Sequence, residues 1–173
     1  MTNSERLALG LIVVGVLSRL IPHPPNVTAV VGASLLASWG IRNLWVAALV
    51  PVAIMALGDL VLGWHGSALF TYAGMLAATF VGRGLIRELS VVRVGTAALL
   101  ASAAFFLISN FGVWAGGYYG YSVEGLVTCY LEAIPFWGNS LIGDLGSTAV
   151  LFGLYVLGRN TFVAANGSAV PRH

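Results

Sequence analysis

Two aspartates lie inside long apolar stretches of the sequence, where an ionisable side chain is expensive to bury. Asp59 and Asp144 each follow a glycine and precede a leucine, and their stretches hold no other charged residue. Such a carboxylate is a candidate for binding a cationic or hydrogen-bonding ligand, because its exposure to lipid would be costly. The alternative is a buried structural pair with Arg19, which lies in the first apolar stretch.

Further polar and aromatic side chains fall near these carboxylates in the expected topology. We expect one ligand-binding site to contain Arg19, His23, Asn26, Asp59, His65, Asn110, Trp114, Tyr118, Glu132, Trp137, Asn139 and Asp144. Tryptophan and tyrosine rings can stack on a ligand, although an aromatic belt at the membrane surface has the same composition. The opposite face is expected to hold only Trp39, Trp45 and Tyr155. This uneven distribution favours a binding site.

Catalytic and metal-binding signatures are missing from the sequence. It has no Gly-x-Ser-x-Gly elbow, P-loop or dinucleotide fingerprint, so we expect neither an enzyme nor an ATPase. His23 and His65 are too few for a metal site by themselves. Completion by Asp59 or Glu132 is the alternative, but no spacing such as HExxH supports it, and we expect no metal and no cofactor. The single cysteine, Cys129, is expected to fill apolar space.

Composition identifies the class of protein that holds these residues. Hydrophobic residues make up 58% of the 173 positions and charged residues only 8%, against roughly 25% charged in soluble domains. The mean hydropathy is +0.91. The isoelectric point near 9.0 does not indicate nucleic-acid binding, because the net charge is only +2 and the arginines are scattered. We expect one integral membrane domain over residues 1–173, with the lipid bilayer as a partner and no nucleic acid.

Six helices account for the apolar stretches, because a bilayer core requires about 20 apolar residues in helical form. We expect an all-α bundle of transmembrane helices at about 7–21, 27–39, 43–64, 67–82, 94–115 and 139–157. Three prolines at 22–25 end the first helix. The second is short for a full span and is expected to be tilted, extended or shielded by protein. Residues 160–173 are expected to form a flexible tail.

The arginines predict how the helices are oriented, because positive residues mark the cytoplasmic side of a membrane protein. All eight basic residues are arginines. Six spans place seven of them on one side, namely Arg6, Arg42, Arg83, Arg87, Arg93, Arg159 and Arg172. Both termini are therefore expected in the cytoplasm, and residues 116–138 outside, where they form an external or re-entrant segment. The alternative, a seventh span at 122–137, would bury Glu124 and Glu132.

Two further patterns concern how the helices pack. Small residues recur four positions apart at Ala33 and Ala37, Ser34 and Ser38, Ala73 and Ala77, and Ala78 and Gly82. Such pairs serve either close packing within the bundle or docking of a partner membrane protein. Residues 51–60 also echo residues 135–145, each running from a proline to Gly-Asp-Leu. This echo is either an internal repeat, as in many transporters, or chance.

Several short segments resemble an uncharacterised family of small bacterial membrane proteins. They are Ile-Pro-His-Pro-Pro-Asn-Val-Thr at 21–28, Gly-Asp-Leu at 58–60 with Gly63 and His65, Asn-Phe-Gly-Val-Trp at 110–114, Cys-Tyr at 129–130, Ala-Ile-Pro-Phe at 133–136, Asn139, and Gly-Asp at 143–144. The resemblance covers about residues 15–150 and brings no established activity. It implies a multi-pass protein of the bacterial cytoplasmic (inner) membrane.

A more distant resemblance is to the substrate-binding S components of energy-coupling-factor (ECF) transporters, the biotin type in particular. It rests on a first helix that ends in an Ile-Pro-x-Pro loop and on the entry into the second helix through Thr28. It implies six helices, cytoplasmic termini and a vitamin or metal site built from the loops after helices 1, 3 and 5. No substrate motif of a characterised S component matches, so the resemblance does not imply a ligand.

Together these observations predict a substrate-binding membrane subunit that takes up a small solute, vitamin-like or cationic, through an outward-facing site. Asp59, Asp144 and Glu132 are the carboxylates expected to face the solute. A separate ATPase module would supply energy, with ECF-type transmembrane and ATPase subunits docking on small residues of the first three helices. The alternatives are a structural or accessory subunit of a larger membrane complex, a stand-alone secondary carrier and an intramembrane enzyme.

Overall fold

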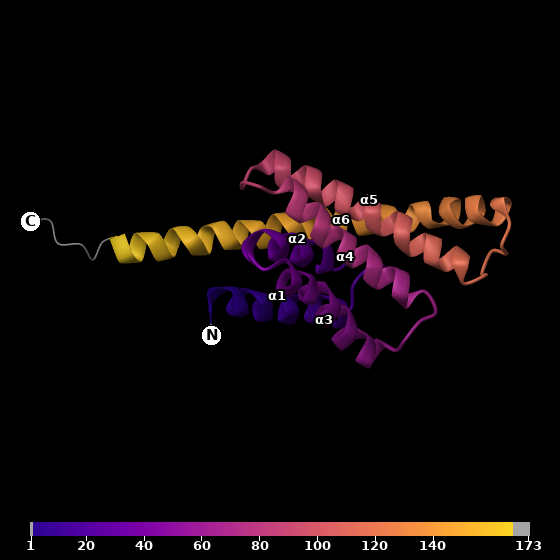
Figure 1. The fold of residues 1–173 in the computed structure, drawn as a ribbon, viewed down its shortest axis with the longest axis horizontal. Coiled ribbons are helices and arrows are strands. Elements are labelled where there is room, and N and C mark those ends of the chain that lie inside the picture. The colour runs from indigo at the N-terminus through magenta and orange to yellow at the C-terminus, as the bar shows by residue number, and fades with distance from the viewer. Residues whose placement is uncertain (1, 168–173) are drawn as a thin grey trace, which may run out of the picture.

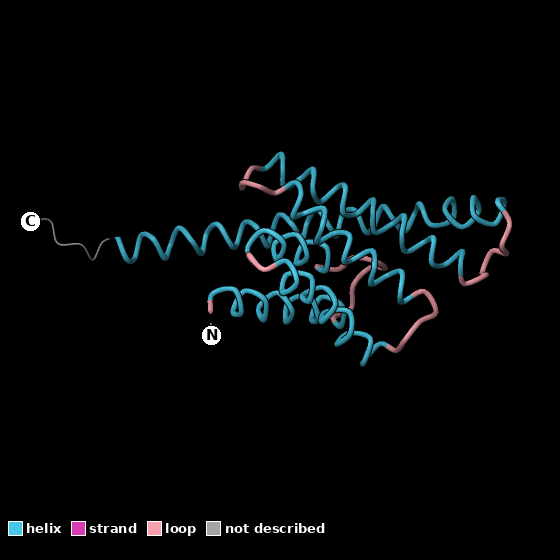
Figure 2. The backbone as a smooth tube through the Cα atoms, viewed as in Figure 1, coloured by secondary structure: helices cyan, strands magenta, loops and turns pink. Residues whose placement is uncertain are grey.

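A computed structural model describes the backbone of residues 2–167 and the side chains of residues 2–159. Six α-helices follow one another, and they are α1 (Asn3–Leu20), α2 (Val30–Gly40), α3 (Leu44–Leu62), α4 (Ala68–Leu85), α5 (Val91–Ala115) and α6 (Val123–Gly167). The described residues contain no strand. Short loops connect the helices (Figure 2), and α6 projects well past the others toward the C-terminus (Figure 1). The all-helical prediction is confirmed.

The short helix α2 forms the centre of the bundle. All of its residues from Val30 to Ser38 are buried, and it contacts each of the other five helices. Its 11 residues rise about 16 Å, only about half of a ~30 Å bilayer core. A helix this short is stable there because protein, rather than lipid, surrounds its ends. Of the three expectations for this helix, shielding by protein is the one that the structure shows.

Small residues allow the neighbours of α2 to approach closely. A Cβ added at Gly32 would meet the backbone nitrogen of Thr148 at 2.9 Å, and one added at Gly82 would overlap the Ser38 side chain. Of the small residues that recur four positions apart, Ala33, Ser34, Ala37, Ser38, Ala78 and Gly82 are buried. They therefore pack the interior, which is the first of the two alternatives, and those of α2 expose no surface. Docking of a partner on the first three helices stays a prediction.

The last helix differs from the prediction. An external segment at 116–138 and a separate helix at 139–157 were expected, but α6 is one continuous helix of 45 residues. Glu124 and Glu132 are exposed on its surface, so the helical form does not bury their carboxylates in the bundle. Pro135 lies inside the helix and removes only one backbone donor, which apolar helices tolerate when neighbouring groups compensate.

The length of α6 also exceeds what a membrane requires. At about 1.5 Å per residue the helix rises about 67 Å, more than twice the ~30 Å bilayer core. Part of α6 must therefore lie outside any membrane that the bundle crosses. The predicted flexible tail at 160–173 is helical as far as Gly167, and residues 168–173 lie outside the described residues.

Within the described part of the chain, four helices are long and apolar enough to cross a membrane, namely α3, α4, α5 and the part of α6 from Val123 to Arg159. The helix α2 is shorter, and α1 carries Glu5, Arg6 and Arg19 among its 18 residues. Large apolar side chains remain exposed on the outer faces of the bundle, as lipid-facing side chains would be. These features indicate a helical membrane protein, while the count of six spans stays a prediction.

The helices alternate between two ends of the bundle. The N-terminus, the α2–α3 and α4–α5 connections and the last part of α6 lie toward one end, which is at the left of Figure 1. The connections at 21–29, 63–67 and 116–122 lie toward the other end. Segments at the first end hold Arg6, Arg42, Arg83, Arg87, Arg93 and Arg159. Arg172 lies outside the described residues, and the side of the membrane that this end faces stays a prediction.

Candidate functional site

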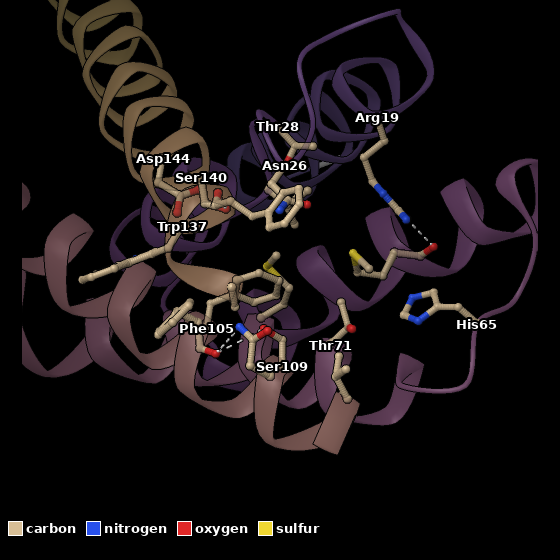
Figure 3. Close-up of a pocket in the computed structure, with 18 of the residues that line it drawn as sticks. Arg19, Asn26, Thr28, His65, Thr71, Phe105, Ser109, Trp137, Ser140 and Asp144 are labelled. Atoms are coloured by element: carbon tan, nitrogen blue, oxygen red, sulfur yellow. Dashed lines mark hydrogen bonds between the residues drawn. The ribbon is translucent and has the colours of Figure 1, made fainter. Parts of the chain in front are cut away.

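A cavity of about 550 Å³ is lined by residues of all six helices and of the α1–α2 and α3–α4 connections. Seven of the predicted site residues line it, and these are Arg19, His23, Asn26, His65, Asn110, Trp137 and Asp144. In Figure 3, Asp144, Ser140 and Trp137 form one wall, while Arg19 and His65 lie on the far side. Residues more than 120 positions apart therefore meet at one site, at the end of the bundle away from most arginines.

Five predicted site residues do not line the cavity. Asp59 is buried behind Arg19, and Trp114 donates its indole N–H to a backbone carbonyl of the α5–α6 connection at 3.2 Å. The others are Tyr118 and Glu132, which are exposed, and Asn139, which is half-buried.

The α5–α6 connection contributes no lining residue, whereas the loops after helices 1, 3 and 5 were all expected to contribute. Helix geometry explains the difference. The continuous α6 carries the chain about 21 Å from Val123 before it reaches Trp137 at the cavity, so the connection lies beyond the site.

Arg19 and Asp59 form a buried salt bridge beside the cavity. Arg19 Nη2 lies 2.6 Å from Asp59 Oδ1, and the two side chains are only 11% and 3% exposed. Arg19 Nη1 donates to the Met55 carbonyl oxygen at 2.8 Å, and the Tyr72 hydroxyl donates to Asp59 Oδ2 at 2.9 Å. Both carboxylate oxygens and both terminal guanidinium nitrogens therefore have protein partners. The structural pairing expected as an alternative is present, and it selects Asp59 rather than Asp144.

The α1–α2 connection is fixed by its sequence. Prolines restrict residues 22–25, and Asn26 adopts a left-handed backbone conformation with φ of 65°, which asparagine tolerates better than most residues. The Ala29 N–H donates to the Ser18 hydroxyl at 3.0 Å and so ties the loop to α1. These restraints hold Asn26 and Thr28 at the cavity.

Asp144 has a different environment from Asp59. It is only 3% exposed, and its Oδ2 has no hydrogen-bond partner among the described residues. The Ser102 hydroxyl of α5 accepts the Trp137 indole N–H at 3.3 Å. No ion pair to Asp144 is present within the described part of the chain. Burying a carboxylate oxygen without a partner is costly. A ligand in the cavity that donated a hydrogen bond to the Asp144 carboxylate would offset this cost.

Aromatic and sulfur-containing side chains form the apolar part of the cavity. The rings of Phe106 and Trp137 stack with centroids 5.0 Å apart, and Met55 and Met75 also line the space. Sequence reasoning missed the lining residues Thr28, Val30, Met55, Leu62, Thr71, Met75, Phe105, Phe106, Ser109, Val113, Ala133, Phe136 and Ser140. Most lie in apolar helical stretches, where a cavity wall and a packed core have the same composition. The only signal in the sequence for these residues was helical spacing, which places Ser140 one turn before Asp144 on the same helix face.

Nearly the whole chain matches one known protein family. A family model described as a family of unknown function (DUF6580) matches residues 2–166. The chain belongs to DUF6580. No curated protein and no solved structure gives a significant match. Membership of DUF6580 agrees with the predicted uncharacterised family, while the similarity to ECF S components stays a prediction.

Proposed function

We propose that this DUF6580 protein binds a small organic solute in the cavity beside Asp144 and serves as the solute-binding membrane subunit of an uptake system. The cavity is the observation that supports this proposal. Its volume of about 550 Å³ falls within the ~300–1,000 Å³ of known small-molecule sites. Its lining has the composition of such sites, with apolar walls and a few converging polar groups.

The position of the cavity suggests the direction of binding. Two of the connections that line it, at 21–29 and 63–67, lie at the end of the bundle opposite the arginine-rich end. Positive residues favour the cytoplasmic side. We therefore place the cavity mouth on the outer side of a bacterial cytoplasmic membrane, with both termini inside.

The energy source in this proposal is a separate pair of transmembrane and ATPase subunits. The sequence has no P-loop, and the resemblance to ECF S components implies such partners. Because the small residues of α2 are buried, these partners would dock on outer helix faces. Ala73 on α4 is one exposed small residue that such a face offers.

Native mass spectrometry of the gently purified full chain tests solute binding. We expect a small molecule bound to the wild-type protein and lost in Ser109→Trp, which adds a large ring to the cavity lining. The matched control is Leu107→Trp, which places the same ring on the exposed face of the same helix and should retain the molecule. A wild-type protein that carries no small molecule would overturn the proposal.

A stand-alone carrier is the second candidate, and the unpaired oxygen of Asp144 favours it, because intramembrane carboxylates often serve transport directly. Proteoliposomes that contain this chain alone distinguish the two. Solute uptake without partner subunits would support the carrier, and binding without uptake would support the subunit of a larger system. A merely structural subunit predicts neither.

A further inference from the structure

The charges around the cavity do not cancel one another. Arg19 is the only arginine in the lining, and its two terminal nitrogens are engaged by Asp59 and by backbone carbonyls. Asp59 in turn has both oxygens occupied. This pair therefore contributes no net charge and offers no free oxygen to a ligand. Among the described residues, Asp144 is the one carboxylate that lines the cavity, and no arginine pairs with it.

The remaining basic groups of the lining are His65 and His23, and His23 shares a second groove with Gly143 of α6. His23 and His65 belong to the α1–α2 and α3–α4 connections and are exposed. Figure 3 shows His65 across the cavity from Asp144, on the side of Arg19. Asp144 shares its wall with the Ser140 hydroxyl and the Trp137 ring, and neither group neutralises a carboxylate.

The aromatic rings that line the cavity also favour a positively charged ligand. Phe105, Phe106 and Trp137 all line the cavity. The faces of aromatic rings attract cations, and the attraction strengthens when water is excluded. A buried carboxylate oxygen beside such rings is a setting for an ammonium group attached to an apolar body.

We propose that the solute is an organic cation, whose ammonium group pairs with the Asp144 carboxylate while its apolar part lies against Phe105, Phe106 and Trp137. This inference rests on the proposed solute-binding function and names the substrate class of the same cavity. It differs from the expectation based on the sequence, in which Asp59 and Glu132 share the role. Asp59 is neutralised by Arg19, and Glu132 is exposed outside the cavity.

Three probes of nearly equal shape and different charge test the substrate class, namely 2-phenylethylamine, 2-phenylethanol and phenylacetate. Their affinities for the purified full chain are measured by calorimetry, together with those of Asp144→Asn and Glu132→Gln. We expect wild-type protein to bind the amine at least tenfold more tightly than the other two. Asp144→Asn should lose this preference, and Glu132→Gln, the same change on an exposed face of the same helix, should keep it.

The outcomes distinguish the inferred charge of the solute from the proposed binding of a solute. The inference that the solute is a cation is overturned if wild-type protein binds the alcohol or the acid as tightly as the amine. It is also overturned if Asp144→Asn binds the amine with unchanged affinity. In both cases the proposal of solute binding stands. The wild-type comparison needs no variant, so poor folding of Asp144→Asn does not remove the test. If no probe binds, a molecule retained in native mass spectrometry decides, since a basic nitrogen supports the inference and its absence overturns it. No probe and no retained molecule overturn the proposed function itself.

Discussion

Arg19 Nη2 lies 2.6 Å from Asp59 Oδ1, which makes a buried ion pair between α1 and α3 across 40 residues of sequence. Asp144 occupies the same Gly-Asp-Leu context but has no such partner, and its Oδ2 is unpaired. One aspartate is therefore neutralised by an arginine of the protein, and the other is not.

Asp59→Asn should destabilise the protein by about 3–5 kcal/mol, because it leaves the Arg19 guanidinium buried without its counter-charge. Thermal unfolding of the purified protein in detergent measures the loss. Asp144→Asn is the matched control and should be close to neutral, since it breaks no ion pair. A stable Asp59→Asn protein would show that the pair contributes little. The double variant Arg19→Met with Asp59→Leu should recover much of the lost stability.

Gly58→Ala should destabilise the same region, because a Cβ at this position would overlap the Arg19 guanidinium. Overpacking of this kind typically costs about 1–3 kcal/mol. The control is Gly10→Ala on α1, where a Cβ meets nothing within 4 Å and helix propensity predicts a gain of up to about 1 kcal/mol. The stability of both variants is read from thermal unfolding. Equal effects at the two glycines would mean that Arg19 does not pack against α3 as described.

Gly32→Ala tests the central position of α2. The added Cβ would meet the Thr148 backbone nitrogen at 2.9 Å, and a helix backbone cannot move aside as a side chain can. We expect a loss of about 2 kcal/mol or more in thermal unfolding. Gly146→Ala on α6 has open space around it and should be tolerated. If both variants unfold like the wild-type protein, α2 and α6 do not pack this closely.

Cysteine labelling tests the orientation. The native Cys129 is buried and is replaced by alanine as background. Cysteines are then introduced singly at His65 and at Arg87, which lie in connections at opposite ends of the bundle. In intact cells a membrane-impermeant maleimide should label position 65 and leave position 87 unlabelled until the membrane is opened. The reverse pattern would place the cavity mouth in the cytoplasm.

Part of the cavity lining follows from the sequence, because alternating helices bring every second connection to the same end. This argument alone placed His23, Asn26 and His65 near Asn110 and Asp144, and all five line the cavity. It could not predict which aspartate pairs with Arg19, because both have the same neighbours in the chain. Only packing of α1 against α3 brings Arg19 to Asp59.

The extent of α6 could not be predicted for a different reason. An external or re-entrant segment was expected at 116–138, because a span at 122–137 would bury Glu124 and Glu132. Helix α6 is continuous through this segment, since its two glutamates remain exposed and the single donor that Pro135 lacks is tolerated. The same error placed Tyr118 in the site. Lining residues such as Phe105 and Met75 were missed because apolar residues at helical spacing also describe an ordinary core.

The central claim is that Asp144 holds a solute within the cavity, and a high-resolution experimental structure of the gently purified protein tests it most directly. We predict density for a non-protein molecule among Asp144, Trp137 and Phe106, with a polar atom about 2.7–3.2 Å from Asp144 Oδ2. Only water in the cavity, or an Asp144 carboxylate paired with a cationic group of the protein itself, would contradict the account.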